Sequence, residues 1–218
     1  MSIWTDTLEK VVKFTVDNLT AEESATRYYQ KAQELRARGR YDGALSNYEK
    51  AINTDPGVYI YWHDMGSCLL DSERYKEAVF YLENASNLET NDVSIWSNLA
   101  FAHIGLQEYR KAKEASEKAV ELDPENHLCW STYAFCYQNL KRYDRAKESY
   151  QRAIDLEGNN PEYWKNLGFC CEELKQYKKA LNAYKKAKEL DPENPEYLQL
   201  ICEAQDRSHK KKKGFIFW

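Results

Sequence analysis

Residues 161–192 read PEYWKNLGFCCEELKQYKKALNAYKKAKELDP, and this stretch decides the fold. In its first half, apolar side chains recur at helical spacing along one stripe: Trp164, Leu167, Cys171 and Leu174. A second stripe follows after a short polar break: Tyr177, Ala180, Tyr184, Ala187 and Leu190. Asp191-Pro192 is a typical helix stop. The stretch therefore predicts two antiparallel helices.

The same pattern recurs every 34 residues. One column holds Tyr41, Tyr75, Tyr109, Tyr143 and Tyr177. Two columns hold alanine, at Ala44, Ala78, Ala112, Ala146 and Ala180 and at Ala51, Ala85, Ala119, Ala153 and Ala187. Another holds the rings Tyr28, Trp62, Trp96, Trp130 and Trp164. A small-residue column predicts close approach of the paired helices: Ala32, Gly66, Ala100, Ala134 and Gly168.

The pattern W-x2-L-G, Y-x2-A-x3-Y-x2-A and D-P resembles the tetratricopeptide repeat, in five copies over residues 25–194. Thr90 and Gly158 replace the terminal proline, and Lys31, His103 and Ser116 replace larger apolar groups. We expect these departures to loosen packing only locally. The resemblance implies an all-α fold, a right-handed superhelical solenoid of antiparallel helix pairs with capping helices at both ends.

Four segments are expected along the chain. Residues 1–20 form an N-terminal amphipathic helix, which either caps the first repeat or serves as a docking or dimerising helix. Residues 21–194 hold five repeats (25–58, 59–92, 93–126, 127–160 and 161–194), and Thr20 with Glu23 predicts a capping box at their start. Residues 195–208 form a C-terminal capping helix, and residues 209–218 a basic-aromatic tail.

The resemblance implies that the first helix of each repeat lines a concave groove. Its sixth position is polar and able to hydrogen-bond a peptide backbone, at Asp64, Asn98, Thr132 and Asn166. Its ninth position holds Phe101, Phe135 and Phe169 in three consecutive repeats, which predicts apolar anchors. The alternative interpretations are that the sixth-position residues are solvated polar side chains on an exposed face, and that the phenylalanines pack between adjacent repeats as core.

No catalytic constellation is recognisable, so the sequence predicts a protein that is not an enzyme and needs no cofactor or metal. The histidines His63, His103, His127 and His209 lie apart, without metal-ligand spacing. Cys170 and Cys171 are interpreted as small buried hydrophobes. Six cysteines without an export signal favour reduced thiols and a cytoplasmic location.

The tail raises a separate question, because Lys210, Lys211, Lys212 and Lys213 precede Phe215, Ile216, Phe217 and Trp218. The tail could be a ligand for its own groove or for that of a neighbouring copy, which would produce a homo-oligomer. It could also bind an anionic membrane surface, bind another protein, or be a frayed end. Outside residues 207–218 the chain has 26 basic and 35 acidic residues, which argues against a nucleic-acid partner.

These observations predict a scaffold or assembly factor that binds a peptide or helix of a partner protein in the groove. The alternative function is a peripheral membrane adaptor that is recruited through its tail.

Overall fold

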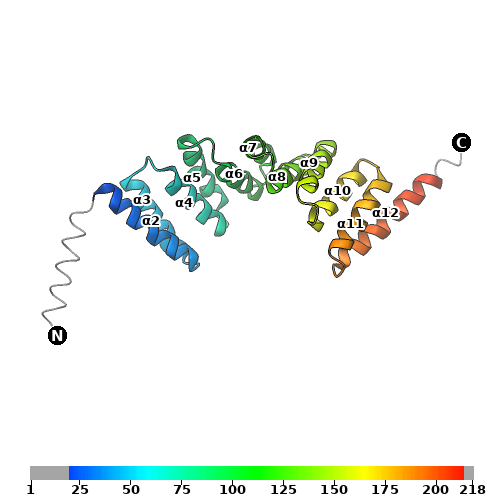
Figure 1. Cartoon of the computed structure of the whole chain (residues 1–218), viewed down its shortest axis with the longest axis horizontal. Helices are drawn as coiled ribbons and strands as arrows, with labels where there is room; N and C mark the ends of the chain where they lie inside the picture. The colour runs from blue at the N-terminus through cyan, green and yellow to red at the C-terminus, as the bar shows by residue number, and fades with distance from the viewer. Residues whose placement is uncertain (1–19, 214–218) are drawn as a thin grey trace, which may run out of the picture. The chain divides into compact units, whose positions relative to one another are not determined.

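The computed structural model describes residues 20–213, with side chains described as far as residue 208. This part of the chain is entirely helical apart from turns (Figure 1). Its helices are α2 (Ala21–Ala37), α3 (Tyr41–Thr54), α4 (Tyr59–Asp71), α5 (Tyr75–Leu88), α6 (Val93–Gly105), α7 (Tyr109–Leu122), α8 (His127–Asn139), α9 (Tyr143–Leu156), α10 (Pro161–Glu173), α11 (Tyr177–Leu190) and α12 (Pro195–Lys213). The expected helix at residues 1–20 falls almost wholly outside the described residues.

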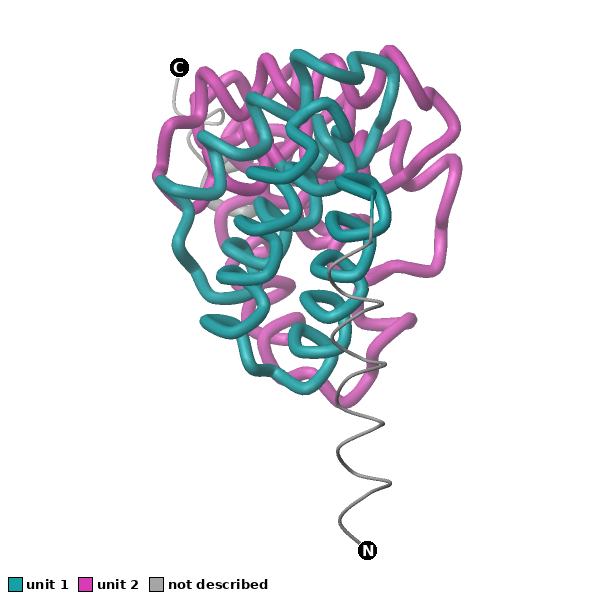
Figure 2. The backbone as a smooth tube through the Cα atoms, turned by 90° about the vertical axis from the view of Figure 1, so that its left-hand side faces the viewer, with its two compact units in different colours: residues 1–98 teal, residues 99–218 magenta. Residues whose placement is uncertain are grey.

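The chain divides into two compact units, residues 1–98 and residues 99–218, with the boundary inside α6 (Figure 2). In the first unit α2 packs against α3, α3 against α4, and α4 against α5. In the second unit every helix from α7 to α12 packs against the next one in sequence. This all-α stack of sequential helix pairs is typical of a tetratricopeptide solenoid, which confirms the predicted fold class.

The turn inside each repeat uses a left-handed residue that the sequence pattern did not reveal. Five residues, each 34 positions apart, have φ between 58° and 70°: Gly39, Glu73, Gln107, Lys141 and Lys175. The next residue's N–H bonds a carbonyl five positions back, for example Arg142 N to Tyr137 O at 2.9 Å. This is the six-to-one bond of a Schellman motif, which ends the first helix and lets the chain reverse. Only the first of the five positions is a glycine, the residue that adopts this conformation most readily.

The small-residue column works as predicted in the two repeats where it is glycine. A Cβ added to Gly168 would lie 2.4 Å from a ring carbon of Tyr184 on the paired helix. One added to Gly66 would lie 2.6 Å from Cγ of Leu82. The helix pairs α10–α11 and α4–α5 thus come closer than any side chain at these positions would allow.

The tryptophan column has a hydrogen-bonding role that explains why the terminal proline can be replaced. The indole N–H of Trp62 donates to Pro56 O at 2.9 Å, and that of Trp130 donates to Pro124 O at 2.8 Å. In the same way, the indole N–H of Trp96 donates to Thr90 O, and that of Trp164 donates to Gly158 O. Because the acceptor is a backbone carbonyl, threonine and glycine serve as well as proline.

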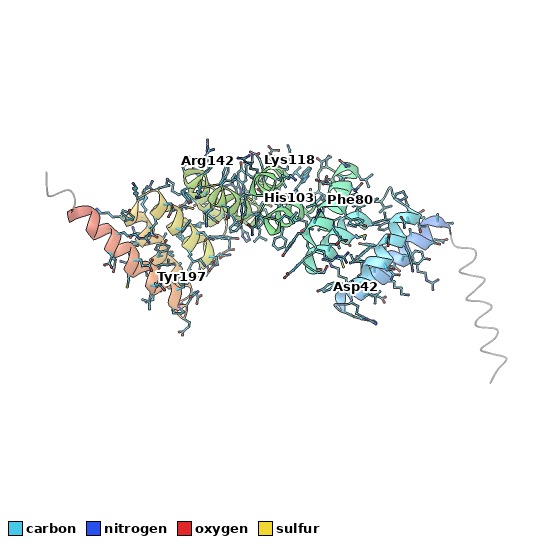
Figure 3. The ribbon with its side chains drawn as sticks, turned by 180° about the vertical axis from the view of Figure 1, so that it is seen from behind. Asp42, Phe80, His103, Lys118, Arg142 and Tyr197 are labelled. Carbon is cyan, nitrogen blue, oxygen red and sulfur yellow. The ribbon has the colours of Figure 1, made fainter. Side chains whose placement is uncertain are left out.

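Both ends of the described stack have clear boundaries. The capping box is confirmed, since Glu23 N donates to Thr20 Oγ1 at 3.2 Å and Thr20 N donates to Glu23 Oε2 at 2.8 Å. At the other end α12 continues to Lys213, beyond the expected limit of residue 208. Residues 209–213, which we assigned to the tail, therefore continue the helix. Tyr197 of α12 is buried against the last repeat (Figure 3).

Candidate functional site

The face expected to bind a ligand is formed by the first helix of each repeat, and in the first unit it is occupied by a polar network. Asp64 of α4 accepts a hydrogen bond from the Tyr29 hydroxyl of α2 at 2.6 Å. Asp64 also pairs with Nδ1 of His63 at 3.0 Å. Burial alone would raise the pKa of Asp64, but hydrogen bonds from His63 and Tyr29 outweigh it and lower that pKa. The carboxylate is thus held ionised by its neighbours in the stack.

Asn98 continues this network from α4 to α6. Its amide nitrogen donates to Ser67 Oγ at 2.9 Å and lies 3.1 Å from Nε2 of His63. Since that amide is a donor, Nε2 accepts and Nδ1 carries the proton shared with Asp64. Two of the residues predicted to hold a peptide backbone, Asp64 and Asn98, already have partners within the chain.

One part of the network resembles a catalytic arrangement without its chemistry. Ser94 Oγ lies 3.2 Å from Nε2 of His63, whose Nδ1 faces Asp64. However, the Ser94 hydroxyl donates its proton to Asp92 Oδ1 at 2.6 Å, so His63 is not positioned to remove it. We interpret this chain of contacts as a link between repeats.

The second unit presents a different surface, which we call the aromatic face: Leu128, Phe135, Asn166 and Phe169, on α8 and α10. Phe135 and Phe169 are 36% and 37% exposed, and Leu128 is 59% exposed. Each ring rests edge-on against a tyrosine, Phe135 on Tyr109 at 6.4 Å and Phe169 on Tyr143 at 6.0 Å between centroids. The two rings therefore pack against the preceding repeat on one side and are partly exposed on the other.

The polar residues predicted on this part of the face differ in what they offer. Thr132 donates its hydroxyl to Leu128 O of its own helix at 2.9 Å. Asn166 is half-buried, and its side chain makes no hydrogen bond to any part of the chain that the structure describes. An amide in that position keeps its donor and acceptor for a ligand. Asn166 lies on the same helix as Phe169, three positions away.

Phe101, the third predicted ring, lies on α6 and is 52% exposed. It belongs to the second unit by its position in the chain, and it has contacts of its own. The predicted column is thus exposed at all three positions.

The rim beside the aromatic face is acidic. Its two basic groups are each shared by two carboxylates. Lys165 Nζ lies 2.7 Å from Glu162 and 3.4 Å from Glu196. Arg207 lies 3.2 Å from the buried carboxylate of Glu172 and 3.9 Å from Glu203. Four carboxylates thus share two positive charges beside the aromatic face.

The remaining candidates have structural roles. Cys170 and Cys171 are buried and free, and burial raises the pKa of the Cys170 thiol to about 12. His103 of α6 is buried and pairs with Glu108 Oε2 at 2.9 Å (Figure 3). Among the side chains that the structure describes, no three histidines, cysteines or acids gather as a metal site. No helix within residues 20–213 is long and apolar enough to cross a membrane.

The tail residues Phe215, Ile216, Phe217 and Trp218 lie outside the described residues, as do the side chains of His209 and of Lys210, Lys211, Lys212 and Lys213. Sequence reasoning missed Tyr29, His63 and Ser67 as parts of the polar network. A signal was available, because Tyr29 and Asp64 are 35 residues apart, as are His63 and Asn98. That separation joins the fifth position of one repeat to the sixth of the next.

Solved structures with the same fold share little sequence with this chain. A crystal structure of MamA matches with a TM-score of 0.75 and 22% identity, covering 80% of this chain and 96% of that one. The MamA 41-end structure from Desulfovibrio magneticus RS-1 matches with 0.76 and 20%, covering 81% and 99%. YrrB, described as a TPR protein with an unusual peptide-binding site, matches with 0.76 and 22%, covering 89% and 97%.

No curated protein matches the sequence. The tetratricopeptide-repeat family, in contrast, matches over most of the chain. One of its profiles covers residues 35–100 and 103–167, and another covers residues 161–194. Tetratricopeptide domains generally bind proteins and are typically not catalytic. With its helix pairs, turns and tryptophan column in phase, the chain belongs to the tetratricopeptide-repeat family.

Proposed function

We propose that this protein is a non-enzymatic scaffold or assembly factor that binds an extended or helical segment of a partner protein on its aromatic face. One observation carries the proposal: Phe135 and Phe169 are exposed beside Asn166, whose side chain has no hydrogen bond within the described residues. Two apolar anchors and one free amide are the elements needed to hold a peptide by its side chains and its backbone.

The second unit is a better binding surface than the first. In the first unit, binding a peptide backbone through Asp64 or Asn98 would break bonds that these side chains already make. Opening such a network leaves polar groups unpaired, at about 1–3 kcal/mol each. A ligand on Asn166 meets no such cost.

The location we propose is the cytoplasm, where buried thiols stay reduced. Cys68 of the second repeat and Cys136 of the fourth are buried thiols without a disulfide, as are Cys170 and Cys171 of the fifth. The structural similarity to YrrB, whose title names a peptide-binding site, supports peptide binding as the general mode.

Selection of random displayed peptides on the full chain tests this proposal. We expect an enriched motif with two apolar residues, and we expect Phe169→Ser to lower affinity for the selected peptides at least about tenfold. Asn166→Ala should lower the affinity for the selected peptides by a smaller factor. The matched control is Phe80→Ser, which removes a ring that is 56% exposed on α5 of the first unit (Figure 3). Selected peptides that bind Phe169→Ser as well as the wild type would place the site elsewhere.

A further inference from the structure

We infer that the occupant of the aromatic face is the tail of a second copy of this chain, residues 210–218, KKKKGFIFW. This inference rests on the proposed function, because it names the partner of the same site. It would make the protein a self-associating scaffold. The following steps compare the charge, the spacing and the reach of the tail with the surface.

Charge favours the tail as a ligand. The aromatic face is apolar, and beside it four carboxylates, those of Glu162, Glu172, Glu196 and Glu203, share two basic groups, Lys165 and Arg207. The tail has the complementary order, four lysines followed by three aromatic residues and Ile216. Lysines at an acidic rim would guide the encounter of two copies, and the aromatic residues would supply the buried contact area.

The spacing of the tail also fits. Phe135 and Phe169 occupy the same position in consecutive repeats, and side-chain contacts connect their helices, His127 Nδ1 meeting the Tyr163 hydroxyl at 2.8 Å. Neighbouring helices in contact are about 10 Å apart. Phe215 and Trp218, three residues apart, would be about 9 Å apart on one side of a polyproline-type segment. Two tail rings could thus meet two face rings without stretching the chain.

The length of α12 argues for a second copy rather than for the same copy. The helix extends to Lys213 within the described residues, and a five-residue segment such as residues 214–218 can reach about 17 Å when fully extended. Glu203 occupies the position of Phe135 two repeats later, and Lys213 lies about 15 Å beyond Glu203 along the helix. With two helix spacings to the side, Phe135 is about 25 Å from the start of the tail. The tail of the same copy cannot cover both rings, whereas that of another copy has no such limit.

Complementation between two variants tests the inference in the full chain. One variant carries Phe215→Ser, Phe217→Ser and Trp218→Ser, which removes the ligand and leaves the face intact. The other carries Phe135→Ser and Phe169→Ser, which removes the face and leaves the ligand intact. Sedimentation velocity from low to high micromolar concentration compares the wild type, each variant alone, and their mixture, with Phe80→Ser as the control.

We expect the wild type and the control to associate, and each variant alone to associate at least about tenfold more weakly. Mixing the two variants should restore a pair, because one copy supplies the tail and the other supplies the face. Circular dichroism checks that both variants keep the helix content of the wild type. A wild type that stays monomeric, or a mixture that behaves like its separate components, would overturn the inference.

Two further measurements separate this inference from the others. Monomeric wild type that binds phosphatidylserine vesicles through its tail would overturn the inference and assign the tail to a membrane surface. If the complementation fails while displayed peptides still bind through Phe169, the proposed function stands and the second-copy inference falls. If the two variants do not complement each other and no displayed peptide binds through Phe169, both the proposed function and the second-copy inference are wrong.

Discussion

Replacing Gly168 by alanine tests how closely α10 and α11 approach each other. The added Cβ would lie 2.4, 2.6 and 3.0 Å from three ring atoms of Tyr184. That ring is fully buried, so it cannot move into solvent to make room. The two helices must separate or the ring must leave its preferred rotamer, and such overpacking costs about 1–3 kcal/mol. The better helix propensity of alanine returns up to about 1 kcal/mol.

The other repeats show which interaction the separation removes. The first and fourth repeats hold alanine opposite a tyrosine, Ala32 with Tyr48 and Ala134 with Tyr150. In both, the buried tyrosine hydroxyl has no hydrogen-bond partner. In the fifth repeat the Tyr184 hydroxyl donates to Glu172 Oε2 at 3.0 Å. We therefore expect Gly168→Ala to weaken this bond as well, and the net loss to be about 1–2 kcal/mol.

Urea unfolding followed by circular dichroism measures this loss, which corresponds to a melting temperature about 2–8 °C lower. Gly158→Ala is the matched control, because its Cβ would meet only Ile154 O at 3.5 Å, an ordinary contact. The double variant Gly168→Ala with Tyr184→Phe should lose less than the sum of the single changes, since the hydroxyl bond is already weakened. Equal stability of the two alanine variants would refute the close-approach argument.

Three further outcomes follow from other residues. Gly39→Ala places a Cβ at φ 70° and should destabilise the chain by about 1 kcal/mol in urea unfolding, whereas Gly57→Ala should not; equal effects would show that the turn adapts. In the native protein about one equivalent of thiol, that of the exposed Cys202, should react rapidly with a chromogenic disulfide reagent, and Cys202→Ser should remove this rapid phase. A rapid phase that survives in Cys202→Ser would contradict the burial of the other thiols. The pKa of Asp64 is lowered on folding, so this carboxylate stabilises the fold above its unfolded pKa and loses that contribution as pH falls through its folded value. The stability deficit of Asp64→Asn should therefore be largest near neutral pH and shrink below about pH 4, and a deficit independent of pH would mean that the charge contributes nothing.

The fold could be predicted from the sequence because each repeat column has one physical reason that acts inside a single repeat. Gly168 faces the ring of Tyr184 in its own repeat, and the indole N–H of each tryptophan in the column donates to a carbonyl six residues earlier. Such short-range contacts recur with the period and are visible as columns. The turn residues were not visible in this way, because Glu73, Gln107 and Lys141 share a backbone conformation but no side-chain chemistry.

The site was harder to predict, because its contacts cross from one repeat to the next. Reading the sixth position as a column grouped Asp64 and Asn98 with Asn166, although only the last lacks a hydrogen bond within the described chain. What separates them is the fifth position of the preceding repeat, 35 residues earlier. Tyr29 and His63 are long enough to reach Asp64 and Asn98 from there.

The same register places Ser131 opposite Asn166, and this pairing explains why the amide is left for a ligand. The serine side chain is short, and its hydroxyl donates instead to Leu128 O of its own helix at 2.9 Å. Asn166 therefore keeps its hydrogen-bonding groups beside Phe169, where an approaching peptide would meet both. A longer polar residue in place of Ser131 would bond Asn166 as Tyr29 bonds Asp64, and would close the proposed site. In the proposed function, binding thus depends on a small residue that itself contacts no ligand.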